Sequence, residues 1–110
     1  MNFDEYQVSS QKTAADFIEE ERKFWTLIAA MGLAGEAGEV VDYIKKVFGH
    51  NHTLDINKLK EELGDVLWYI ADVCAKFNIS MDEVAQLNIE KLKARYPDGF
   101  SQEMSKNRKA

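Results

Sequence analysis

The chain has 110 residues and a formal net charge of −5, with 45% apolar and 30% charged residues. This length is typical of one domain, and the composition is ordinary for a soluble globular protein. The acidic balance argues against a sequence-independent nucleic-acid binder, which normally carries a basic face. A phosphorylated small molecule stays possible as a ligand, because a bound metal can supply positive charge locally.

The N-terminal segment and the cysteine content indicate a cytoplasmic protein that does not cross a membrane. No run approaches the roughly 20 apolar residues that span a bilayer, and no basic segment followed by an apolar one marks a signal peptide. Cys74 is the only cysteine, which excludes an internal disulfide and fits a reducing compartment. Because Cys74 lies in an apolar helical stretch, we expect a buried structural thiol.

The first half of the chain predicts two helices. One is expected over about residues 3–23. The next runs from about residue 23 or 25 to residue 48 and stops at Gly49, a typical residue just past a helix end. A loop over residues 49–54 follows, so the two central helices are expected to form a hairpin.

The second half predicts two more helices and a tail. Asp55 is a candidate N-cap for a helix over about residues 56–77. Ser80 and Glu83 have the spacing of a capping box, which predicts a fourth helix from there to about Arg95. Residues 101–110 are polar, and we expect a mobile tail. The predicted fold is therefore an all-α, four-helix bundle-like monomer.

The apolar stripes of the two central helices are broader than one neighbouring helix would cover. Each stripe has an additional shoulder, formed by Val41 and Phe48 on one helix and by Leu67 and Cys74 on the other. We therefore expect each monomer to bury apolar surface against another subunit.

Two acidic pairs border these stripes. Glu36 and Glu39 lie on the second helix, and Glu62 and Asp65 lie on the third. The i, i+3 spacing puts each pair on one helical face, roughly 5–6 Å apart. Four gathered carboxylates would repel one another without a counter-charge, and a divalent cation would relieve that repulsion. The pattern predicts a metal site within a helical bundle.

The donor types indicate which metal this site would hold. Carboxylate oxygens suit Mg²⁺ or Mn²⁺, which also coordinate substrate phosphates. Zinc prefers nitrogen or sulfur, and di-iron bundles use Glu-x-x-His motifs. Neither acidic pair contains a histidine, and the two histidines, His50 and His52, lie together in the loop. The donor set therefore predicts Mg²⁺ or Mn²⁺ and does not choose between them.

The fourth helix carries a complementary polar row. Asn88, Lys91 and Arg95 fall on one face, where they would either pair with nearby acids or bind a chain of phosphates. Trp68 and Tyr69 are candidates for stacking on a nucleobase, although aromatic residues at helical spacing are more often part of a core.

Three blocks of this sequence together resemble the MazG-type nucleotide pyrophosphohydrolases. The first is Gly32-Leu-Ala-Gly-Glu-Ala-Gly-Glu-Val-Val-Asp42 followed by Lys46, and the second is Glu61-Glu-Leu-Gly-Asp-Val-Leu-Trp-Tyr69. The third runs from Asn88 to Phe100. The resemblance implies a single helical domain over residues 1–100 that assembles as a homo-dimer or homo-tetramer.

The resemblance also implies Mg²⁺-dependent hydrolysis of a (deoxy)nucleoside triphosphate to the monophosphate and pyrophosphate. Glu36, Glu39, Glu62 and Asp65 would then be catalytic metal ligands. The implied phosphate contacts, some of them from a neighbouring subunit, are Lys46, Asn88, Lys91 and Arg95. Two alternatives stay open. One is a related all-α dUTP or dCTP pyrophosphatase or phosphoribosyl-ATP pyrophosphohydrolase; the other is a non-catalytic nucleotide-binding or assembly module.

Overall fold

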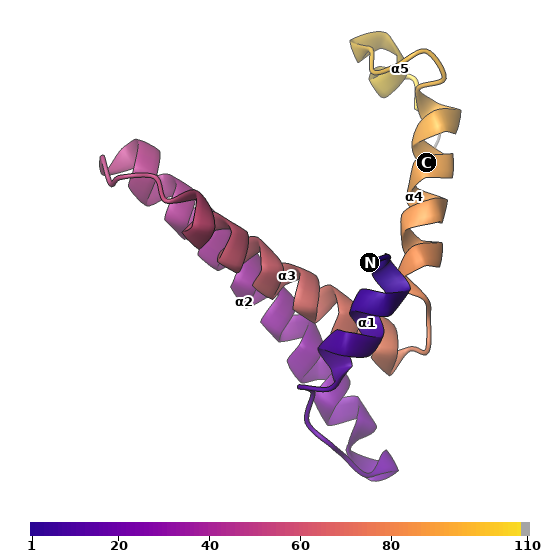
Figure 1. Cartoon of the computed structure of the whole chain (residues 1–110). Helices are drawn as coiled ribbons and strands as arrows, with labels where there is room; N and C mark the ends of the chain where they lie inside the picture. Colours follow the sequence, from indigo (N-terminus) through magenta and orange to yellow (C-terminus); the bar gives the residue numbers. More distant parts are fainter. Residues whose placement is uncertain (109–110) are drawn as a thin grey trace.

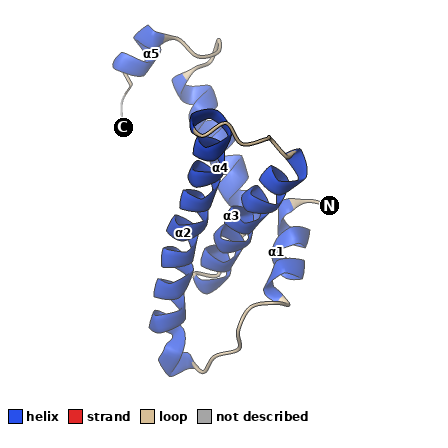
Figure 2. Ribbon diagram, turned by 90° about the vertical axis from the view of Figure 1, so that its left-hand side faces the viewer, coloured by secondary structure: helices blue, strands red, loops and turns tan. Residues whose placement is uncertain are grey.

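The computed structural model describes residues 1–108, and all regular secondary structure in that part of the chain is helical, as predicted (Figure 2). It contains five α-helices and one short 3₁₀ helix. In chain order these are α1 (Phe3–Gln11), η1 (Glu19–Glu21), α2 (Arg22–Gly49), α3 (Ile56–Lys76), α4 (Met81–Arg95) and α5 (Gln102–Lys106). No strand occurs among the described residues.

Helices α2 and α3 form the predicted antiparallel hairpin, which is the largest packed unit (Figure 1). Tyr43 holds the connecting loop closed: its hydroxyl accepts a hydrogen bond from the Asp55 N–H at 2.8 Å and donates one to the Asp55 carbonyl at 3.1 Å. The Asp55 side chain accepts from the N–H groups of Asn57 and Lys58, so the predicted N-cap is confirmed. This antiparallel pairing brings the middle of α2 beside the first half of α3.

The first helix is much shorter than predicted, because it ends at Gln11 rather than near residue 23. Its last turn is diverted by side chains. The Ser10 carbonyl accepts from the Thr13 hydroxyl at 2.7 Å and from the Trp68 indole N–H at 3.1 Å. Short hydroxyl side chains that bond the local backbone compete with helix continuation. The chain then runs without helix to η1 and turns into α2.

The segment between α1 and α2 is attached by Phe17. The Arg22 guanidinium lies 5.1 Å from the centre of the Phe17 ring, and the Lys76 ammonium lies 5.0 Å from it. Lys76 also pairs with Asp72 at 2.7 Å, where both side chains are almost fully enclosed. These contacts fix the start of α2 against the end of α3.

Helix α4 projects away from the α2–α3 hairpin instead of closing a four-helix bundle (Figure 1). Ser80 caps its first turn by accepting from the Glu83 N–H. Beyond α4, the short helix α5 occupies part of the predicted tail. The rest of that prediction, for residues 109 and 110, lies outside the described residues.

The hydrophobic core of the described chain is small. Among residues 1–108 the buried apolar residues are Ala29, Ala71, Cys74 and Met81, and no large side chain there is fully buried. Cys74 is therefore the buried thiol that the sequence predicted, and burial raises its pKa. Many large apolar side chains are exposed instead, and Phe48 reaches 82%. As a monomer, this fold leaves much of its apolar surface uncovered.

The expectation that no segment reaches membrane-spanning length is wrong by length and composition. Residues Glu19–Gly49 form one helical stretch that is long and apolar enough to cross a bilayer. One such helix is weak evidence for a membrane span, because buried helices of soluble proteins pass the same test, although little of this stretch is buried within one chain. This one also carries Glu36 and Glu39, and carboxylates are costly inside a bilayer.

Candidate metal centre

Three of the four predicted acids converge between α2 and α3. Glu36, Glu62 and Asp65 each offer a carboxylate oxygen, and these oxygens lie within 4.8 Å of one another. The i, i+3 spacing on α3 presents two of them, and the hairpin register brings the third from α2. Glu36 and Glu62 are half-buried, whereas Asp65 is exposed.

The cluster carries the electrostatic signature of crowded carboxylates. The pKa of Glu36 is raised, first because partial enclosure desolvates the charged form and then because Asp65, Glu62 and Glu39 repel it. An all-oxygen donor set of this kind fits a hard divalent cation such as Mg²⁺ or Mn²⁺. A cation would remove the repulsion that raises this pKa.

Glu39 lies outside this group of three. It is exposed on α2, and it adds to the repulsion on Glu36 without bringing an oxygen into the cluster. The structure thus separates the four predicted acids into three convergent carboxylates and one neighbouring carboxylate.

A lysine that was not predicted as a site residue pairs with the cluster. The Lys58 ammonium lies 3.1 Å from Glu62, whose side chain is only 13% exposed. The hydrogen bond to Glu62 raises the pKa of Lys58. Its position four residues before Glu62 is the spacing of a helical ion pair, so the signal was present in the sequence.

Aromatic side chains border the carboxylates. Trp68 and Tyr69 join Glu36 and Asp65 in lining a cavity of about 360 Å³. The two rings meet edge to face, with centroids 5.0 Å apart. The predicted pair of aromatic residues therefore does lie beside the acids.

Both aromatic rings are fixed by contacts outside the cavity. The Trp68 indole N–H donates to the Thr13 hydroxyl at 2.9 Å as well as to the Ser10 carbonyl. Tyr69 lies over Gly32 so closely that a Cβ on this glycine would fall 2.1 Å from the ring. The absence of a side chain at Gly32 is what makes room for Tyr69.

Tyr6 is a further neighbour of the cluster that was not predicted as a site residue. Its pKa is raised by burial and then by the charge of Asp65. Helix α1 carries it across α3, and no local sequence signal marks that crossing.

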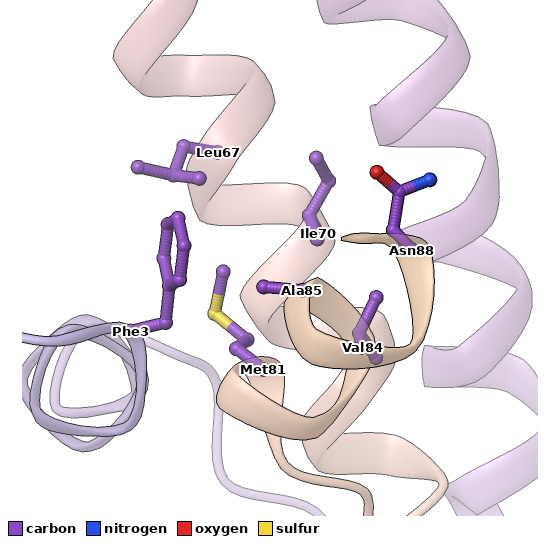
Figure 3. Close-up of a pocket in the computed structure, with 7 residues that line it drawn as sticks. All are labelled: Phe3, Leu67, Ile70, Met81, Val84, Ala85 and Asn88. Atoms are coloured by element: carbon purple, nitrogen blue, oxygen red, sulfur yellow. The ribbon is translucent and has the colours of Figure 1, made fainter. Parts of the chain in front are cut away.

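The predicted phosphate contacts are not gathered at the acids within this chain. Lys46 pairs with Asp42 at 2.8 Å, one turn away on the same helix. Asn88 lines a different, apolar cavity of about 280 Å³ between α1, α3 and α4, with Phe3, Leu67, Ile70, Met81, Val84 and Ala85 (Figure 3). Lys91 and Arg95 lie farther along α4, which diverges from the hairpin (Figure 1).

The fold and site together define a helical hairpin protein with a carboxylate centre suited to a divalent cation. Residues 26–100 match the model of the MazG nucleotide pyrophosphohydrolase domain. The chain therefore belongs to this family, and its general class is a pyrophosphohydrolase-type enzyme.

One relative extends the match over nearly the whole chain. It is the Gene 37 protein of Mycobacterium phage L5, which is 32% identical over 119 residues. The match covers 98% of this chain and all of the relative. The name of that protein states no activity. No solved structure matches the chain.

Proposed function

We propose that this protein hydrolyses (deoxy)nucleoside triphosphates to the monophosphate and pyrophosphate, with Mg²⁺ or Mn²⁺ as cofactor. The observation that carries the proposal is the convergence of Glu36, Glu62 and Asp65 beside an aromatic cavity, in a chain of the MazG family. Glu36, Glu62 and Asp65 would hold the metal. When bound, the metal would neutralise phosphate charge and orient the attacking water.

The residues of the chain divide the remaining work. Glu39 lies outside the three convergent carboxylates, so it is free to accept the proton of the attacking water. Trp68 and Tyr69 offer an aromatic wall beside the acids, where a nucleobase or the sugar would lie. If Glu39 is instead a fourth ligand, its removal will weaken metal binding as well as turnover.

We further propose that the active form is a homo-oligomer. The accessible surface of 8422 Å² exceeds the roughly 6,200 Å² expected for a folded monomer of 12.6 kDa. The radius of gyration, 17.3 Å, likewise exceeds the roughly 13 Å of a compact chain of this length. The excess area is of the size that obligate interfaces bury.

In an oligomer, the basic end of α4 from one subunit could lie beside the acid cluster of another subunit. The end of α4 bears Lys91, Lys93 and Arg95, whereas the acid cluster has Lys58 as its paired cation. Opposite charge would favour contact between α4 of one subunit and the hairpin of another. Sedimentation velocity at micromolar concentration tests this: a stable monomer would remove the proposal.

The activity is tested with a panel of nucleotides incubated with Mg²⁺ or Mn²⁺, with products identified by phosphorus NMR. The expected products are pyrophosphate and a nucleoside monophosphate. Release of orthophosphate would indicate that a different phosphoanhydride bond is cleaved. The panel includes dUTP, dCTP and phosphoribosyl-ATP, which separates the related activities. Absence of turnover with every nucleotide would favour a binding or assembly module.

Matched variants assign the residues. Glu62→Gln should abolish both metal binding and turnover, while Glu61→Gln, at an exposed acid next in sequence, should retain both. Glu39→Gln should abolish turnover and retain metal binding, measured by calorimetry with Mn²⁺. Wild-type turnover in Glu62→Gln would refute the site.

A further inference from the structure

The turn that starts α4 is held by side chains of α1. The Gln7 side chain amide donates to the Ile79 carbonyl at 3.0 Å and accepts from the Met81 N–H at 3.0 Å. Asp4 accepts from the Ser80 hydroxyl at 2.7 Å and from the Asp82 N–H at 3.1 Å. Two side chains of α1 thus bond four consecutive residues of the turn.

The contact is reciprocal, because α4 returns a hydrogen bond to α1. The Asp82 carboxylate accepts from the Phe3 N–H at 3.0 Å. Each helix therefore places an acid at the N-terminus of the other, where unpaired N–H groups and the helix dipole favour negative charge. These bonds lower the pKa of Asp4, with the Ser80 hydroxyl as the largest cause. We call this set of contacts, made by Asp4, Gln7 and Asp82, the α1–α4 clasp.

Apolar packing holds the two helices less completely. Met81 is buried against Ala71 and Cys74. Beside it, Phe3 of α1 and Val84 of α4 border the open cavity of about 280 Å³ (Figure 3). Tyr6 of α1 also packs against the cluster that contains Met81. Because the cavity beside these contacts is unfilled, they leave α4 room to tilt, and the polar clasp opposes that tilt.

The angle matters because α4 is long and its far end is free of the hairpin (Figure 1). Arg95 lies thirteen residues beyond Asp82, which corresponds to about 20 Å along the helix axis. A tilt of about 10° at the first turn would move that end by about 3 Å, more than a hydrogen bond tolerates.

We propose that Asp4, Gln7 and Asp82 are positioning residues that fix the direction of α4 and so place its Asn88–Lys91–Arg95 row. The clasp itself is a property of the fold. Its effect on substrate binding rests on the proposed function and on the sequence-based prediction that this row binds phosphates.

The direction of α4 is measured directly with two spin labels. The labels replace Lys60 on α3 and Lys93 on α4, both exposed, in a Cys74→Ala background. Labelled protein is mixed with excess unlabelled protein, so that distances between subunits do not contribute. Gln7→Met keeps the side-chain volume and removes two clasp bonds, and Asp82→Ala removes the return bond. Asp82→Asn is the matched control, because its amide oxygen still accepts from Phe3.

The clasp predicts a broader label–label distance distribution in Gln7→Met and in Asp82→Ala, with the wild-type distribution kept in Asp82→Asn. All variants should retain wild-type helix content by circular dichroism, because these side chains lie outside the core. An unchanged distribution in both Gln7→Met and Asp82→Ala would overturn the proposal.

Steady-state kinetics of the same variants then test whether the clasp affects substrate binding, separately from whether the protein has the proposed activity. In an active enzyme, losing one charged phosphate contact should raise KM about tenfold in Gln7→Met and Asp82→Ala, with a smaller change in kcat. An unchanged KM would overturn the positioning role. If the wild-type protein turns over no nucleotide, the proposed function fails, and the label distances alone decide whether the clasp orients α4.

Discussion

The close packing of the Tyr69 ring against Gly32 gives the sharpest test of how α2 and α3 contact each other at the site. In Gly32→Ala, the new Cβ would lie 2.1 Å from Tyr69 Cε1, 2.5 Å from Cζ and 2.6 Å from Cδ1. Carbon atoms in contact prefer about 3.5–4.0 Å. The ring must therefore move away from the new Cβ by more than about 1 Å to reach that separation. Because the ring borders the carboxylate cavity, this movement should also disturb the site.

The size of the effect follows from two opposing terms. Overpacking typically costs about 1–3 kcal/mol, while replacing a mid-helix glycine with alanine gains about 1 kcal/mol. The net change in wild-type protein is therefore a loss between about 0 and 2 kcal/mol. In a Tyr69→Ala background the clash is absent, and the same substitution should stabilise by about 1 kcal/mol.

A double-mutant cycle measured by urea denaturation isolates the contact. The expected coupling between residues 32 and 69 is about 1–3 kcal/mol. Gly49→Ala on the same helix is the matched control, because its Cβ would meet the Lys45 side chain at an ordinary 3.8 Å. Equal effects of Gly32→Ala in the two backgrounds would refute the packing described here.

Three further outcomes are expected. Thr13→Val should lower the free energy of unfolding by about 1 kcal/mol, because the Trp68 indole loses one acceptor; chemical denaturation measures this, and no loss would contradict the bond. Asp4→Asn should weaken the loss of folding stability at acid pH. The pKa of Asp4 is lower in the folded than in the unfolded protein, so its carboxylate contributes stability above the unfolded pKa that is lost as pH falls through the folded pKa. The same dependence of unfolding free energy on acid pH in both proteins would contradict this. Lys58→Met should tighten Mn²⁺ binding in calorimetry, because it removes the cation paired with Glu62, and weaker binding would show that Lys58 supports the metal site.

Local signals in the sequence were sufficient for the hairpin and for most of the carboxylate cluster. The Asp55 cap and the i, i+3 acids depend only on neighbours along the chain, and the antiparallel hairpin then dictates which faces meet. The resemblance to the MazG family was confirmed on the same segments.

The parts that the sequence did not reveal depend on distant contacts. The end of α1 depends on the Ser10 carbonyl, which accepts from Trp68, 58 residues away. The proximity of Tyr6 to Asp65 depends on α1 crossing α3. The direction of α4 depends on the clasp between α1 and the turn before α4, and periodicity within α4 carries no information about it.

The glycines of α2 and α3 near the acids differ in whether another residue of the chain covers their backbone. Tyr69 of the same chain covers Gly32, whereas at Gly35, Gly38 and Gly64 nothing in the described chain, apart from adjacent residues and the helix's own nearby backbone, lies within 4 Å of where a Cβ would be. Each mid-helix glycine costs about 1 kcal/mol relative to alanine, and packing within the chain does not recover this for the open three. They lie next to Glu36, next to Glu39 and next to Asp65, respectively. Within one chain these three backbone faces therefore stay open beside the acids, in contrast to Gly32, which is covered by the Tyr69 ring.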